Sequence, residues 1–137
     1  MAKETFKLLI LTPYGRYFEG NVEFLEVHST EYNLGILPHH APLISTVAIS
    51  KLMVRMAGRE LNYAVGGGVI HVTKEGTKLI LDSIERSDEI DVQRAKEAKE
   101  RAEKRLKESE KDEEIDINRA KLALLKAINR LNVSSKR

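Results

Sequence analysis

The first part of the chain has the hydrophobic pattern of short strands. Up to about Arg86, apolar runs such as "FKLLIL", "VEFLEV", "KLMVRM" and "TKLIL" alternate with turn residues, a pattern typical of β-strands. Gly58 and Gly76 stand in "MAGRE" and "TKEGTK", where a glycine can adopt the positive φ of a tight hairpin turn. Many short strands at close spacing predict a sandwich or a barrel over residues 1–86.

The pattern changes at Ser87 to one that predicts helices. Residues 87–137 contain neither Gly nor Pro and are rich in Ala, Glu, Lys, Arg and Leu, which have high helix propensity. The stretch 107–116 is charged and has no apolar periodicity, so we expect the chain to reverse there. We therefore predict an all-β unit over 1–86, followed by an antiparallel two-helix hairpin over 87–137.

A short motif occurs at the start of each predicted helix. The chain reads "IDVQRAKEA" at 90–98 and "IDINRAKLA" at 115–123. Asp91 and Asp116 each precede a helical pattern, where a carboxylate can accept hydrogen bonds from the free N–H groups of the first turn. The isoleucine before each aspartate can fix the direction in which the chain enters the helix. On this evidence the repeat marks two helix starts.

The two predicted helices present apolar stripes of unequal size. The second helix has a stripe at i, i+3, i+4 and i+7 spacing, which consists of Ala120, Ala123, Leu124, Ala127, Ile128 and Leu131. The first helix has a thinner stripe, which consists of Ala95, Ala98, Ala102 and Leu106. An alanine-rich seam buries little apolar area and gives a marginal hairpin. We expect a part of the protein that can fold up or extend, depending on what it contacts.

Basic residues lie beside both apolar stripes. Each helix carries a trio of cations at i, i+7 and i+11, and at 100° per residue each trio shares one face. The trios are Arg94, Arg101 and Arg105, and Arg119, Lys126 and Arg130. If these faces converge, they can clamp a polyanion such as a nucleotide triphosphate. The alternative is a set of solvated cations that bind nothing, which is the commoner state of Lys and Arg and is favoured by the spacing alone.

The last helix is wholly basic after Asp116. No acidic residue follows Asp116, whereas Lys and Arg continue to the end of the sequence. Cations near the end of a helix stabilise it through its dipole, which accounts for some of them. A docking surface for an acidic protein segment is the functional interpretation. An RNA-binding surface is a third interpretation, but the lack of aromatic residues among these cations argues against single-stranded RNA.

Composition narrows the classes of function. The net charge is +2, so the chain as a whole has no strong field that attracts nucleic acid. No cysteine is present, which excludes disulfides, thiolate metal sites and cysteine nucleophiles. No apolar run approaches the roughly 20 residues that span a bilayer, and strand-like sequence rather than a secretory signal follows Glu4, so we expect a soluble cytosolic protein.

No constellation of residues predicts catalysis or a metal site. "AVGGGVIHV" lacks the Gly-Lys-Ser/Thr of a phosphate loop, so we interpret it as a glycine bend between strands. The histidines are not spaced to share a metal ion, and no serine lies in a nucleophile elbow. The loop "LGILPHHAPLIS" combines irregular backbone with apolar residues. It is either an exposed contact surface or a buried crossover, and the pattern leaves both open.

Three motifs resemble one family. "LGILPHHAPL", "YAVGGGVIHV" and "DSIERSDEIDVQRAKEA" are similar, in order and spacing, to the epsilon subunit of bacterial F-type ATP synthases, and in particular to its bacillus-type, ATP-binding members. The resemblance covers nearly the whole chain. It implies an N-terminal flattened β-sandwich that binds the gamma subunit and the c-ring. It also implies a C-terminal helical hairpin that either lies folded or extends along gamma towards the alpha and beta subunits, where it inhibits ATP hydrolysis.

The resemblance also implies site residues. A nucleotide site that holds the hairpin folded would consist of Glu85, Asp91, Arg94, Arg101, Lys126 and Arg130. The family pattern has an arginine where Lys126 stands, and a lysine keeps the charge but loses the two-pronged hydrogen bond to phosphate. Only the first copy of the repeat aligns with the family motif, so the second is a helix cap alone. Partner contacts would involve His39, His40, Arg119 and Lys121, and the basic last helix would meet an acidic segment of beta.

Our leading hypothesis is a non-catalytic rotor subunit of the proton-translocating ATP synthase, peripheral to the cytoplasmic face of the bacterial cell membrane. Its sandwich would couple rotation and its hairpin would inhibit hydrolysis, with ATP as a regulatory ligand and with no required cofactor. A free-standing nucleotide-sensing protein is the main alternative. An RNA-binding β protein, whose affinity would fall steeply with salt, is a weaker one.

Overall fold

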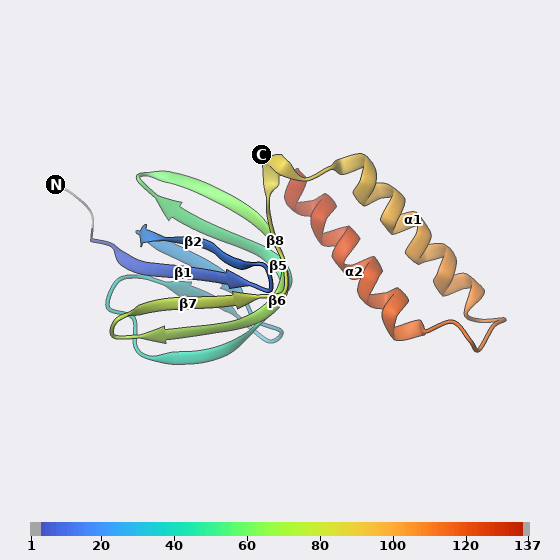
Figure 1. Ribbon diagram of the computed structural model, residues 1–137, viewed down its shortest axis with the longest axis horizontal. Coiled ribbons are helices and arrows are strands. Elements are labelled where there is room, and N and C mark those ends of the chain that lie inside the picture. The colour runs from blue at the N-terminus through green and yellow to red at the C-terminus, as the bar shows by residue number, and fades with distance from the viewer. Residues whose placement is uncertain (1–3, 136–137) are drawn as a thin grey trace. The chain divides into compact units, whose positions relative to one another are not determined.

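The protein is described here by a computed structural model that covers residues 4–135. Within that range the chain forms eight strands and then two α-helices (Figure 1). It divides into two compact units, residues 1–86 and 87–137. No helix of the described residues is long and apolar enough to cross a membrane.

The first unit is all β. Its strands are β1 (Phe6–Thr12), β2 (Gly15–Val22), β3 (Phe24–His28), β4 (Asn33–Ile36), β5 (Leu43–Met56), β6 (Arg59–Thr73), β7 (Gly76–Leu81) and β8 (Ile84–Arg86). They pair in the order β2-β1-β7-β6-β5-β3-β4, with β8 paired to β6. All pairs are antiparallel except β1 with β7. The sheet folds over on itself as a β-sandwich, which confirms the predicted fold (Figure 1).

Alternate side chains of the strands fill the space between the two layers. In β7, the buried Thr77, Leu79 and Leu81 alternate with the exposed Lys78 and Ile80, which is the period of two expected for a half-buried strand. Each of β1–β7 contributes at least one side chain that is at most 1 % exposed: Leu8, Val22, Leu25, Ile36, Leu52, Ile70 and Leu79. Burial stabilises the fold by roughly 1.5–3 kcal/mol for each such side chain.

The three glycines of β6 lie where the strand on one side of β6 changes from β8 to β7, while β5 stays on the other side. Up to Val65, β6 pairs with β8, and from Gly68 onward it pairs with β7. Gly67 has a φ of 96°, and a Cβ added to Gly68 would lie 1.9 Å from the carbonyl oxygen of Ile80. Only glycine fits such a close backbone approach. The glycine bend predicted from the sequence is therefore confirmed.

The second unit is a helical hairpin, as predicted. A short 3-10 turn, η1 (Ser87–Glu89), precedes the two helices α1 (Val92–Glu108) and α2 (Ile117–Ser134). The helices pack against one another and run antiparallel (Figure 1).

Both copies of the repeated motif cap a helix. The Oδ1 atom of Asp91 accepts a hydrogen bond from the backbone N–H of Arg94 at 3.0 Å. In the same way, Oδ1 of Asp116 accepts from the N–H of Arg119 at 3.1 Å. Each aspartate satisfies one of the N–H groups that a helix start leaves without an intrahelical partner. The prediction of two N-caps is confirmed.

The seam between α1 and α2 consists of small residues. Four alanines are at most 4 % exposed and recur every seven residues in each helix: Ala95, Ala102, Ala120 and Ala127. The larger residues of the predicted stripe on α2 lie at the margin of the seam and are only half-buried: Leu124, Ile128 and Leu131. Ala123, predicted on the same stripe, is exposed. Because an alanine removes little apolar surface from water, this seam is a weak contact.

Candidate functional site

The first candidate site is the face of the hairpin that carries the basic residues. On each helix, a cation occupies the position directly before each seam alanine. Its side chain therefore points about 100° away from the seam around the helix axis. They are Arg94 and Arg101 in α1, and Arg119 and Lys126 in α2. Equivalent flanking positions of two antiparallel helices lie on one face of the pair. Arg105 and Arg130, each four residues beyond one of these cations, lie on the same face, and we call the six residues the basic face.

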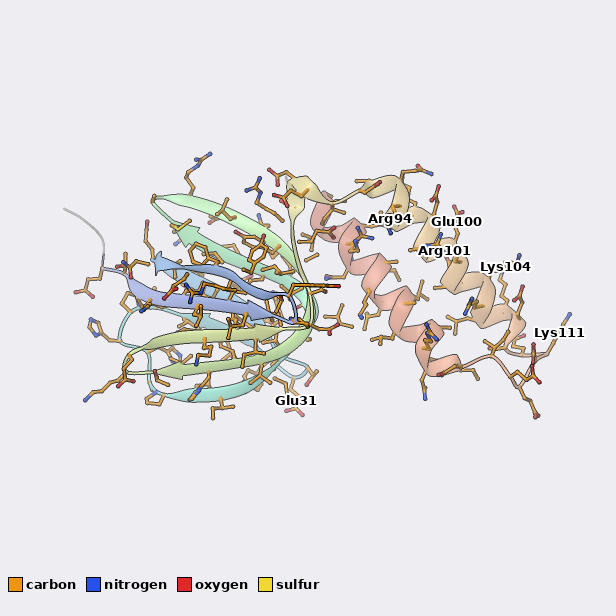
Figure 2. All side chains as sticks on the ribbon, viewed as in Figure 1. Glu31, Arg94, Glu100, Arg101, Lys104 and Lys111 are labelled. Atoms are coloured by element: carbon orange, nitrogen blue, oxygen red, sulfur yellow. The ribbon has the colours of Figure 1, made fainter. Side chains whose placement is uncertain are left out.

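The arrangement of the basic face suits a polyanion. Antiparallel packing places Arg94 and Arg130 at one end of the hairpin and Arg119 at the other. Figure 2 shows Arg94 and Arg101 along α1. The three cations of α1 are exposed, whereas those at the end of α2 are half-buried. Guanidinium groups match phosphate oxygens, so a ligand with several negative charges can contact cations of both helices at once.

The structure brings four of the six predicted nucleotide-site residues onto this face: Arg94, Arg101, Lys126 and Arg130. Asp91 lies at the start of α1, where its carboxylate is engaged as the helix cap. Glu85 lies in β8, in the other unit, and is not part of the basic face. Residues 4–135 contain no group of three or more His, Asp or Glu side chains that could hold a metal ion.

The two predicted contacts on α2 point in different directions. Arg119 and Lys121 are two residues apart, which corresponds to about 200° around a helix. Arg119 therefore belongs to the basic face, whereas the exposed Lys121 lies on the opposite side. Exposed apolar residues also lie along α2: Ile117, Leu122 and Leu125 are 45 to 50 % exposed. A partner that contacted both cations would have to cover the side of α2 that faces away from the seam.

The second candidate site is the loop 37–42 between β4 and β5. Ile36, directly before it, is fully buried, whereas Leu37 is 58 % exposed. The loop is therefore anchored in the core and presents an apolar side chain to solvent. It lines a cavity of about 550 Å³ together with the start of β1 and the turn between β6 and β7. The loop is therefore exposed and is not a buried crossover. That it is a contact surface stays a prediction.

His39 and His40, the predicted contact residues of this loop, differ in their surroundings. His39 has a φ of 67°, which costs a residue other than glycine about 1 kcal/mol. Its ring is 83 % exposed, with Nε2 at 3.3 Å from Oε2 of Glu4. The ring of His40 is fixed by its Nδ1, which donates to the carbonyl oxygen of Ala41 at 2.7 Å. His39 is thus held in a strained conformation with its imidazole in solvent.

The third candidate site was not predicted from the sequence. Five apolar side chains point away from the core on adjacent strands: Leu9 and Leu11 of β1, Ile80 of β7, Val69 of β6 and Ile44 of β5. We call them the outer apolar face. The sheet register aligns Leu11, Ile80 and Val69 in one row across three strands. Ile44 is 69 % exposed, Ile80 50 % and Val69 40 %. In the next row, the exposed Lys78 and His71 lie between Leu9 and Ile44. Exposed apolar residues that cross several strands are typical of contact surfaces for other proteins.

A signal for the outer apolar face is nevertheless present in the sequence. A strand with one side in water needs an apolar residue only at every second position. The runs "LLIL" in β1 and "LIL" in β7 are apolar at consecutive positions, which indicates that both sides of these strands contact apolar surroundings.

Comparison with known proteins shows the family of the chain. The domain described as "ATP synthase, Delta/Epsilon chain, beta-sandwich domain" matches residues 5–87, and "ATP synthase, Delta/Epsilon chain, long alpha-helix domain" matches residues 88–135. The chain therefore belongs to the ATP synthase delta/epsilon chain family. Within it, the chain is similar to proteins named ATP synthase epsilon chain. That of Alkaliphilus oremlandii is 44 % identical over 105 residues, which are 77 % of this chain and 78 % of the relative.

Further relatives agree with this assignment. The ATP synthase epsilon chain of Halalkalibacterium halodurans is 38 % identical over 105 residues, which are 77 % of this chain and 79 % of that protein. A chain in a structure of the Euglena gracilis mitochondrial ATP synthase superposes with a TM-score of 0.82 over 100 % of this chain and 85 % of that chain. Their identity is 18 %, so this likeness shows the fold alone. The resemblance read from the sequence is confirmed, and so is the prediction of a non-catalytic subunit.

Proposed function

We propose that the chain is a rotor subunit of a bacterial, proton-translocating F-type ATP synthase, whose hairpin inhibits ATP hydrolysis when extended and is held folded by bound ATP. Its sandwich binds the gamma subunit and rests on the c-ring, at the cytoplasmic face of the membrane. The observation that carries the regulatory part is the basic face, where cations of both helices lie on one side of the hairpin.

The physical reason is that ATP would bind only the folded hairpin well. The phosphates can contact cations of α1 and α2 together only while the two helices lie side by side. A ligand shifts a conformational equilibrium by the difference in its affinity for the two states. The alanine seam contributes little to the stability of the folded hairpin. A modest difference in affinity for ATP is therefore enough to decide whether the hairpin is folded.

Calorimetric titration of ATP into the full-length protein tests this proposal. Arg94→Ala removes one guanidinium from the basic face and should weaken binding about tenfold or more, as expected for a charged hydrogen bond. Lys121→Ala is the matched control, because it removes an equal charge from the opposite side of α2. ADP, with one phosphate fewer, should compete weakly. No heat at millimolar ATP, or equal losses in the two variants, would exclude the nucleotide site.

Lys126 allows a gain of affinity to be tested. It occupies the basic face, but an ammonium group cannot make the two parallel hydrogen bonds of a guanidinium. Lys126→Arg should therefore tighten ATP binding several-fold, whereas Lys121→Arg should leave it unchanged.

The sandwich would bind its partners through the outer apolar face and the loop 37–42. We assign the outer apolar face to the gamma subunit, because an apolar surface across several strands suits a long-lived protein contact. The loop, with His39 and His40, remains a proposed partner contact. The main alternative, a free-standing nucleotide sensor, does not explain why Ile44 and Ile80 are exposed.

Binding to the isolated gamma subunit tests this assignment. Val69→Asp places a charge in the middle of the outer apolar face and should weaken binding more than tenfold. Tyr14→Asp is the control, because Tyr14 is 99 % exposed in the turn between β1 and β2 and is not one of the five residues of that face. Unchanged binding of Val69→Asp would refute the assignment, and ATP binding without any binding to gamma would favour the free-standing sensor.

A further inference from the structure

Two exposed polar side chains interrupt the outer apolar face. Lys78 of β7 and His71 of β6 are register partners. In the same row, Leu9 lies next to Lys78 on one side, and Ile44 lies next to His71 on the other. Along β7, the next outward-facing residue after Lys78 is Ile80. Apolar side chains therefore border this pair on three sides, and the pair lies within the outer apolar face.

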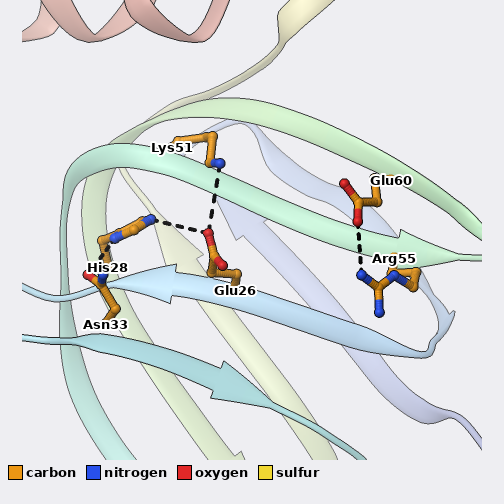
Figure 3. A network of polar contacts seen from close by, with 6 residues as sticks. All are labelled: Glu26, His28, Asn33, Lys51, Arg55 and Glu60. Atoms are coloured by element: carbon orange, nitrogen blue, oxygen red, sulfur yellow. Dashed lines mark hydrogen bonds and ion pairs between the residues drawn. The ribbon is translucent and has the colours of Figure 1, made fainter. Parts of the chain in front are cut away.

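Lys78 differs from other cations of the sandwich in having no carboxylate partner. On β5, Nζ of Lys51 lies 3.8 Å from Oε1 of Glu26, and Nη2 of Arg55 lies 2.9 Å from Oε1 of Glu60 (Figure 3). Among residues 4–135, no carboxylate forms an ion pair with Lys78. Its ammonium group therefore depends on water for its hydrogen bonds.

A cavity of about 280 Å³ lies beside the pair, and both Lys78 and His71 are part of its lining. Two carboxylates also line this cavity, those of Glu19 and Glu75. Oε2 of Glu19 is engaged by Nη1 of Arg16 at 2.6 Å. Glu75 lies in the turn that precedes β7. The cavity therefore leaves room beside Lys78 for an acidic side chain from another protein.

A partner that covers the outer apolar face must also cover this pair. Leu9 and Ile44 lie on either side of it, so a partner that contacts both removes water from Lys78. Burial of a charge without an opposite charge is strongly unfavourable. A carboxylate of the partner would offset this cost through charge-assisted hydrogen bonds. The ring of His71 can donate a further one, because imidazole carries an N–H in either charge state.

We propose that the outer apolar face receives an acidic side chain of its partner at Lys78 and His71. The inference rests on the proposed function, which assigns this face to the gamma subunit, and it specifies the chemistry of the gamma surface that docks there. That surface combines aliphatic side chains with an aspartate or glutamate placed against Lys78. The charged contact fixes the position of the two surfaces, because a purely apolar contact discriminates little between neighbouring positions.

Binding of the full-length protein to the isolated gamma subunit tests this inference through the direction of one change. Lys78→Met keeps the apolar stem of the side chain and removes its charge. It should weaken binding at least tenfold, because the carboxylate of gamma is then buried without its cation. Without such a carboxylate, the same change would leave binding unchanged or tighten it, because a charge buried unpaired is removed. Unchanged or tighter binding therefore overturns the inference.

Two further variants separate the specific contact from general attraction between charges. Lys78→Glu places two negative charges together and should weaken binding more than Lys78→Met does. Arg59→Met removes an equal charge from an exposed position at the other end of β6 from His71, and should leave binding unchanged. Added salt should narrow the difference between the wild type and Lys78→Met. Equal losses in Lys78→Met and Arg59→Met would also overturn the inference.

Val69→Asp distinguishes a failure of this inference from a failure of the proposed function. If Val69→Asp weakens binding to gamma and Lys78→Met does not, gamma binds the outer apolar face without a carboxylate at Lys78, and only the inference fails. If neither variant weakens binding, the outer apolar face is not the contact with gamma, and both fail.

Discussion

The sandwich and the hairpin are stabilised by different kinds of core. Leu, Ile and Val side chains from β1–β7 fill the interior of the sandwich, whereas the buried apolar residues described in the second unit are the four seam alanines, Ile90 and Val133. A buried leucine contributes roughly 1.5–3 kcal/mol, and an alanine contributes far less. The difference teaches that this chain joins a firmly packed unit to two helices that bury little apolar surface between them.

The two units also present different surfaces. The outer apolar face of the sandwich presents exposed aliphatic side chains with Lys78 among them, whereas the hairpin presents cations from both helices on one side. Apolar surfaces favour contacts that persist once formed, and charged surfaces favour contacts that respond to ligands and salt. This contrast fits a unit that stays bound and a unit that moves.

The largest expected effect lies in the sandwich core. Leu79→Ala removes a fully buried side chain and should lower the free energy of unfolding of the sandwich by about 3 kcal/mol. All four tyrosines precede Ser87, so tyrosine fluorescence follows the sandwich, while circular dichroism at 222 nm mainly follows the helices. The fluorescence transition in urea should move to lower concentration and the helical one should move less. Equal shifts would show that the two units unfold together.

A smaller effect is expected from overfilling the hairpin seam. Ala102→Leu inserts a large side chain between α1 and α2 and should cost about 2 kcal/mol of helix packing. The chain has no cysteine, so cysteines introduced at the exposed Glu103 and Leu122 can carry spin labels that report the distance between helices. This distance should increase. Glu100→Leu, at an exposed position of α1 (Figure 2), is the control and should leave the distance unchanged.

Removal of a helix cap should have a still smaller, local effect. Asp116→Ala deletes the acceptor for the N–H of Arg119 and should destabilise α2 by about 1 kcal/mol. Amide exchange in the first turn of α2 should become faster, with no change in tyrosine fluorescence. Asp116→Asn keeps an equivalent acceptor and should behave like the wild type. A loss of protection in the asparagine variant equal to that in alanine would mean that charge, and not the hydrogen bond, holds the helix start.

The smallest expected effect is a gain in stability. His39→Gly relieves the positive φ of the loop and should raise the free energy of unfolding of the sandwich by about 0.5 kcal/mol, because glycine costs some entropy in return. It should also weaken partner binding if the imidazole is a contact. Ala57→Gly is the matched control, since Ala57 has a φ of 52° in a turn outside this loop. Partner binding that is unaffected by His39→Gly would remove His39 from the proposed contact.

Sequence reasoning predicted the fold class and the helix caps because both depend on local pattern. A period of two marks strands, and Asp91 and Asp116 cap the helices that begin next to them. The outer apolar face was missed for a physical reason. In "VIHV", Val69 faces out and Ile70 faces in, and a shift of one residue in register would exchange them. Which residues of an apolar run face the core is settled by the packing of the whole sheet.

By itself the sequence determined where strands give way to helices, which aspartates start the helices and that cations recur at helical spacing. Only the tertiary structure decided which charges lie together on one face. Arg94 and Arg130 are far apart in the sequence and lie on one face, because two antiparallel helices bring equivalent flanking positions to the same side. Arg119 and Lys121 are near neighbours in the sequence and lie on opposite sides of α2. The spacing of residues around a helix follows from the local sequence. Which side of the helix is buried depends on the distant segment that packs against it.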